Sequence, residues 1–117
     1  MAYNEQLTNR IREALAHLPK VEEKKMFRGV TFMVNGKMCI SAGNDEMMCR
    51  IDPYVFEAAV EKPGCRPMVH NGRTMKGFVF VNEESIRNKK EFNYWISLAL
   101  DFNKKAKASS KKKKNNT

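Results

Sequence analysis

"GVTFMVNGKMCISAGNDEMMCRID", residues 29–52, is the stretch that decides the fold. Asn35-Gly36 lies between two apolar runs. This dipeptide favours a type I′ hairpin turn, because both central residues of such a turn need a positive φ. A second turn is expected near residues 43–45, where Gly, Asn and Asp follow one another. The stretch therefore predicts three consecutive antiparallel strands joined by two hairpins.

The register of the second hairpin follows from the two-residue period of side chains in a strand. Pairing Ala42 with Met47, and Ile40 with Cys49, places the apolar residues of both strands on one face. A slip of one residue would bring Arg50 onto the face of Ile40. We therefore predict the first register.

Upstream, an apolar stripe at helical spacing predicts an amphipathic helix. Asn4 is its expected N-cap, and Pro19 stops it. Downstream, Asp52-Pro53 has the form of a helix start, and Pro63 ends this short helix. The stripe of the first helix comprises Leu7, Ile11, Ala14, Leu15 and Leu18.

The last helix is expected to begin at Asn88, because Glu91 follows three residues later as in a capping box. It should extend to about Phe102. Its apolar stripe comprises Phe92, Trp95, Ile96, Ala99 and Phe102.

"GCRPMVHNGRTMKGF", residues 64–78, contains a thiol and an imidazole that could suggest an active site. Asn71-Gly72 repeats the hairpin dipeptide, and the residues that follow are β-branched and aromatic, which is typical of a strand. Pro67 restricts the preceding strand to a short edge piece. Cys65 would need activation by a base, and no third group is evident to orient His70. We therefore predict a hairpin here and no catalytic residues.

These elements predict an α+β fold, with a two-layer antiparallel five-stranded sheet packed with helices in the order α-β-β-β-α-β-β-α. This domain is expected to span residues 1–103. The chain's net charge of +9 arises mainly from residues 104–117, which hold seven lysines and no acid. The remaining 15 basic and 13 acidic residues leave the domain at +2.

Residues 104–117 contain no large apolar side chain, so we expect a disordered tail. The run Lys111, Lys112, Lys113 and Lys114 is a candidate for weak, non-specific nucleic-acid binding, which would depend strongly on salt. The body shows no nucleic-acid reading motif.

The composition also limits the function classes. No apolar run approaches the ~20 residues of a membrane helix, and the N-terminus does not resemble a signal peptide. Three cysteines without C-x-x-C spacing favour a reducing compartment, so we expect a cytoplasmic protein. The cysteines and the two histidines are too scattered for a metal site. We expect no cofactor and see no evident small-molecule substrate.

Four motifs resemble those of the TfoX/Sxy family, in particular its stand-alone proteins that look like the TfoX N-terminal domain. They are "KKMFRGVTFMVNGKM" (24–38), "MMCRIDP" (47–53), "KPGCRPM" (62–68) and "GRTMKGFVFV" (72–81), followed by the tryptophan helix. The resemblance extends over roughly residues 3–102. It implies an α+β fold and a bacterial regulator related to competence for DNA uptake, with no established enzymatic chemistry.

This sequence departs from the family pattern at Arg28, where family members usually have glycine. Arg28, Arg66, Arg73 and Lys76 are the candidate residues for binding an anion or a partner. The first and last strands have apolar residues on both faces, so a sheet covered on one side would leave an apolar patch for a second copy or a protein partner. We therefore expect a small non-enzymatic interaction or regulatory module that acts through protein contacts.

Overall fold

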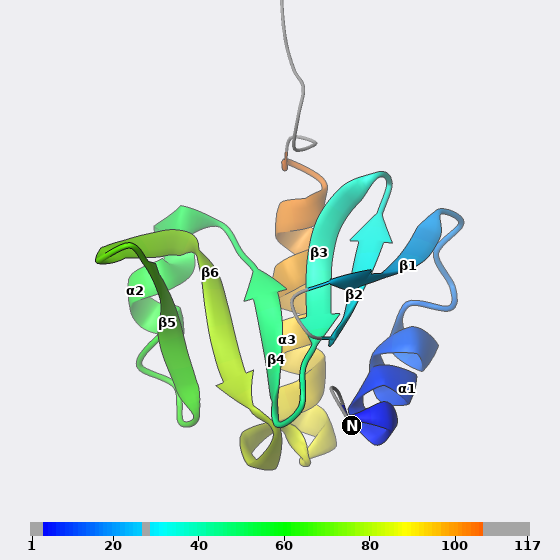
Figure 1. The fold of residues 1–117 in the computed structure, drawn as a ribbon, viewed down its shortest axis with the longest axis horizontal. Helices are drawn as coiled ribbons and strands as arrows, with labels where there is room; N and C mark the ends of the chain where they lie inside the picture. The colour runs from blue at the N-terminus through cyan, green and yellow to red at the C-terminus, as the bar shows by residue number, and fades with distance from the viewer. Residues whose placement is uncertain (1–3, 27–28, 107–117) are drawn as a thin grey trace, which may run out of the picture.

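The computed structural model describes residues 4–26 and 29–106, in which an antiparallel six-stranded sheet packs against α-helices (Figure 1). Along the chain the elements are α1 (Glu5–Ala14), β1 (Val21–Met26), β2 (Gly29–Val34), β3 (Lys37–Ala42), β4 (Glu46–Arg50), the 3-10 helix η1 (Pro53–Val55), α2 (Phe56–Ala59), β5 (Cys65–His70), β6 (Arg73–Asn82), the 3-10 helix η2 (Glu83–Ile86) and α3 (Lys89–Asn103).

The α+β class is confirmed, but the predicted five strands and their order are wrong. The sheet has the order β1-β2-β3-β4-β6-β5, and the additional strand is β1 at one edge. Its sequence, VEEKKM, is charged at four of six positions, and Glu22 to Met26 are all exposed. An edge strand without a buried face shows no apolar alternation, so the sequence pattern predicts no separate strand before β2.

Both predicted Asn-Gly turns are confirmed. Asn35 and Gly36 have φ values of 54° and 76°, and Asn71 and Gly72 have 53° and 76°. The predicted register is confirmed as well, because Ala42 pairs with Met47 and Ile40 pairs with Cys49.

The predicted helix starts are also present. The Oδ1 atom of Asn4 accepts a hydrogen bond from the backbone N of Leu7. At the start of η1, Asp52 Oδ1 accepts one from the backbone N of Tyr54. Asn88 accepts from Lys90 N at 2.7 Å and from Glu91 N at 3.3 Å. The carboxylate of Glu91 forms an ion pair with Lys62 at 3.0 Å.

The hydrophobic core lies between the sheet and the helices. In Figure 1, α3 runs behind β3 and β4, and α2 lies behind β5 and β6. α1 joins α3 through Arg10, whose guanidinium lies 4.0 Å from the ring centroid of Phe92. The largest fully buried core side chains include Trp95, Phe32, Leu7, Ile11, Leu15, Ile40, Met47, Ile51, Ile86, Val79 and Val81.

We call the opposite side of the sheet the open face; one cross-strand row on it comprises Lys24, Thr31, Ser41, Met48, Phe80 and Arg66. Thr31 is fully buried, and its hydroxyl lies 2.9 Å from that of Ser41. This face therefore contains a satisfied hydroxyl pair beside the apolar side chains of Met48 and Phe80 in the same row. Because a buried hydroxyl without a partner is costly, this pair stabilises the close packing of β2 and β3.

Residues 105 and 106 make contacts with the domain although the predicted tail began at residue 104. Lys105 Nζ lies 2.8 Å from Asp52 Oδ2, and Ala106 is buried. Lys111–Lys114 and Arg28 lie outside the described residues. In the ranges 4–26 and 29–106 no helix is long and apolar enough to cross a membrane.

Candidate functional site

The β5–β6 hairpin enters the sheet through a turn that requires glycine. Gly64 has a φ of 78°, and a Cβ atom there would lie 1.9 Å from Ser85 Oγ. Cys65 then pairs with Val81, and Pro67 pairs with Val79. The base of the hairpin is thus packed closely against η2, the 3-10 helix that precedes α3.

The outer end of the hairpin extends beyond the rest of the sheet. β4 pairs with β6 only from Phe78 to Asn82, whereas β5 continues to pair with β6 as far as His70 and Arg73. The register shifts between Pro67 and Met68, so that Met68 pairs with Met75. Residues 68–76 therefore form a two-stranded ribbon, which bends away from the sheet in Figure 1. We call this ribbon the β5–β6 arm.

The arm exposes apolar side chains. Val69 is 59% exposed and Met75 is 37% exposed, on strands that pair with no neighbour other than each other. A two-stranded ribbon has no core of its own, so Val69 and Met75 are only partly buried within the domain. The prediction did not include Val69 and Met75, because the length of β6 relative to β4 is not evident from sequence pattern.

The predicted cations separate into two groups. Arg66 lies on the open face, 2.7 Å from Glu46 and with its guanidinium 4.3 Å from the ring centroid of Phe80. Arg73 and Lys76 are exposed on the arm, and within residues 4–26 and 29–106 neither forms an ion pair. Among the predicted cations in the described residues, only these two lie on the arm. By strand alternation Arg73 shares one face of the arm with Met75, and Lys76 shares the opposite face with Val69.

The arm also contains no negative charge of its own. No Asp or Glu occurs between Gly64 and Asn82, a range that includes the whole of β5 and β6. This combination of unpaired cations and exposed apolar side chains can bind a surface that is both acidic and apolar.

The structure separates the thiol and imidazole that the sequence placed close together. Cys65 begins β5 and His70 ends it, and a strand rise of ~3.3 Å per residue puts them roughly 16 Å apart. Desolvation raises the pKa of the Cys65 thiol to about 11, so it is protonated at neutral pH.

The other two cysteines are buried free thiols. Desolvation raises the pKa of Cys39 to about 12, and it raises that of Cys49 well above the ordinary value. In the described part of the chain no three His, Cys, Asp or Glu side chains are grouped so that they could hold a metal ion.

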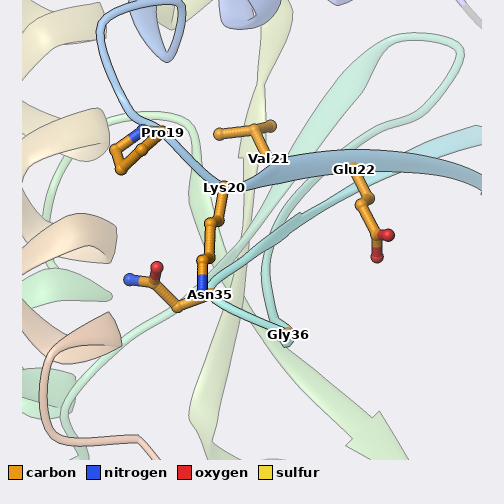
Figure 2. Close-up of a pocket in the computed structure, with 6 residues that line it drawn as sticks. All are labelled: Pro19, Lys20, Val21, Glu22, Asn35 and Gly36. Atoms are coloured by element: carbon orange, nitrogen blue, oxygen red, sulfur yellow. The ribbon is translucent and has the colours of Figure 1, made fainter.

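A hollow of about 550 Å³ lies between the α1–β1 connection and the β2–β3 turn (Figure 2). Its lining includes Pro19, Lys20 and Asn35, and Lys20 extends toward Asn35 in Figure 2. The walls are mainly turns, joined by a backbone hydrogen bond of 2.9 Å from Asn35 N to Lys20 O. Among the described residues that line this hollow, none is a cysteine, serine, threonine or histidine.

Comparison with known proteins gives two findings. The family model described as the TfoX N-terminal domain matches residues 13–103. The fold is similar to the crystal structure of a protein from Pseudomonas syringae, with a TM-score of 0.60 and 14% sequence identity, covering 82% of this chain and 94% of that one. At this identity the likeness concerns the fold alone. No significant match was found among curated proteins.

Proposed function

The chain belongs to the TfoX N-terminal domain family, and from this premise we propose that it is a small, non-enzymatic regulatory module that acts through protein contacts. Its place of action is the cytoplasm, where free thiols such as Cys39, Cys49 and Cys65 persist. Regulation of competence for DNA uptake is the process that the family resemblance suggests.

The observation that carries this proposal is the β5–β6 arm. Val69 and Met75 are exposed on a ribbon that projects from the sheet, and Arg73 and Lys76 are free of ion pairs in the described part of the chain. Exposed apolar side chains bordered by polar ones are typical of protein interaction sites. The partner surface therefore combines an apolar contact with acidic side chains.

The cysteines support a non-enzymatic role. A nucleophilic cysteine works as a thiolate with a lowered pKa, whereas burial raises the pKa of all three thiols here. Cys65 is the most accessible of the three, and its potential base His70 lies at the other end of the strand.

The proposal can be tested by affinity capture from native cytoplasm, in the presence of nuclease, followed by quantitative mass spectrometry. One variant carries Val69→Ser with Met75→Ser, and another carries Arg73→Glu with Lys76→Glu. We expect both variants to lose the same protein that the wild-type chain retains.

A matched control reverses two exposed charges elsewhere, Lys89→Glu with Lys90→Glu at the start of α3. This control should retain the partner. Retention by both arm variants at wild-type levels, or equal loss in the control, would show that the arm is not the contact surface.

The alternative is weak, non-specific nucleic-acid binding through Lys111–Lys114. It rests on the lysine run in the sequence, since those residues lie outside the described ranges. The nuclease in the capture experiment separates the two functions, because only material bound through nucleic acid is released by it.

A further inference from the structure

Within residues 4–26 and 29–106, β1 pairs with no strand other than β2, so it forms one edge of the sheet, and it is the strand farthest from the β5–β6 arm in strand order. It is six residues long, its pairing with β2 contains no bulge, and Glu22 to Met26 are exposed. Edge strands of this kind present a row of unpaired backbone groups to other chains. Proline or a bulge often blocks such an edge, and β1 has neither.

The backbone direction along β1 can be assigned from one hydrogen bond. Asn35 N donates to Lys20 O at 2.9 Å, so the backbone of Lys20 points toward β2. In an antiparallel pair, the backbone N–H and C=O groups of every second residue point toward the neighbouring strand, so those of Glu22 and Lys24 also point toward β2. The N–H and C=O groups of Val21, Glu23 and Lys25 point out of the sheet.

If β1 of two copies pairs antiparallel across a two-fold axis, that axis runs perpendicular to the sheet. Each face of one copy then continues into the same face of the other, so residues that lie opposite each other must come from the same face. With Glu23 opposite Glu23 of the second copy, Val21 lies opposite Lys25, and all these residues have outward backbone groups. On the open face, Glu22 then lies opposite Lys24 of the second copy, and by symmetry this pair occurs twice.

Charge favours this register over the next one. Arg12 forms a two-pronged ion pair with Glu23, with N–O distances of 2.6 and 2.8 Å. Its hydrogen bond holds the pKa of Glu23 below its ordinary value, so the carboxylate is ionised and already neutralised by its own helix. In the register shifted by two residues, Lys24 would lie opposite Lys24 of the second copy, and the two positive charges would repel. Within residues 4–26 and 29–106 Lys24 forms no ion pair that would offset this repulsion.

We propose that β1 pairs antiparallel with β1 of a second copy of this chain, centred on Glu23 and held in register by Glu22–Lys24 pairs on the open face. Charged residues usually keep edge strands apart. Here Glu22 and Lys24 are two residues apart, so in the antiparallel pair each of them lies opposite the residue of opposite charge in the second copy. The dimer continues the six-stranded sheet into its partner and leaves both β5–β6 arms free at the two far edges.

Sedimentation equilibrium of the full chain at low ionic strength tests this inference through charge reversal. The wild-type protein should form a dimer whose fraction rises with concentration. Glu22→Lys and Lys24→Glu, each alone, create two like-charge pairs and should weaken the dimer by about tenfold or more. An equal mixture of the two variants restores opposite charges in both pairs, so it should dimerise as the wild-type protein does.

Glu61→Lys and Lys90→Glu, both at exposed positions away from β1, are the matched controls and should leave the dimer unchanged. Restored dimerisation in the mixture also shows that both variants are folded. A wild-type chain that stays monomeric at its highest attainable concentration, a dimer that Glu22→Lys does not weaken, or a mixture that remains monomeric would each overturn the inference. Because the arm variants leave β1 intact, failure of the dimer and failure of the arm can be distinguished.

Discussion

The protonation state of Cys65 is the sharpest test of a non-enzymatic role. Desolvation raises its pKa from 9.0 to about 11, which reduces the thiolate fraction at neutral pH by about 100-fold. A more basic thiolate is intrinsically more nucleophilic, which recovers about tenfold of this loss. The net expectation is alkylation about tenfold slower than that of an ordinary thiol.

The assay is the pH dependence of iodoacetamide modification, with each cysteine followed separately by peptide mass spectrometry. Cys65 in the folded chain should show a midpoint near 11, and the same peptide in concentrated urea should show a midpoint near 9. The unfolded chain is the matched control, because the reagent and the peptide are the same. A folded-state midpoint at or below about 7, as in activated cysteines, would refute the reasoning.

The same shift predicts how stability depends on pH. A thiol whose pKa is higher in the folded state binds its proton more tightly there, so its contribution is complete below about pH 9. It is lost as the pH rises toward 11. Urea unfolding should therefore show a decline above pH 9 that is smaller in Cys65→Ser.

Three further outcomes are expected. Asn88→Ala should lower the free energy of unfolding by about 1 kcal/mol in urea titration, because α3 loses its N-cap; no change would contradict this assignment. Gly64→Ala should lower the free energy of unfolding by about 1–3 kcal/mol in the same titration. Adding Ser85→Gly should recover the part of this loss that comes from the clash with Ser85, and the part that comes from the positive φ should remain. Deletion of residues 107–117 should abolish any salt-sensitive binding to single-stranded DNA in a fluorescence titration while preserving the thermal melting curve; binding that survives the deletion would place it on the domain.

The parts of the fold that depend on local chemistry were predicted correctly from sequence. Asn35-Gly36 and Asn71-Gly72 adopt positive φ because few other residue pairs tolerate it, and the hairpins follow from these turns. The pairing of Ala42 with Met47 could be predicted because one side of the hairpin had to be apolar throughout.

The edge of the sheet could not be predicted in the same way. β1 has charged residues on both faces, and its strand conformation is stabilised by pairing with β2 rather than by burial. Its sequence therefore lacks the alternation from which strands are recognised.

The candidate site was predicted only in part, since its composition depends on tertiary contacts. Arg66 is near Arg73 and Lys76 in the sequence, but it contacts Glu46, a residue 20 positions away. That contact depends on the order β4-β6-β5, which turn signals do not determine. The exposure of Val69 likewise depends on the shift between Pro67 and Met68, which lets the arm leave the sheet.

The most direct test of the central claim places a photo-crosslinking amino acid at position 69 in living cells. Position 54 is the control, because Tyr54 is 95% exposed but lies on η1, outside the arm. The β5–β6 arm predicts a protein adduct from position 69 that disappears with Lys76→Glu, which lies on the same face of the arm, and no such adduct from position 54. Equal adducts from both positions, or none from position 69, would contradict the claim.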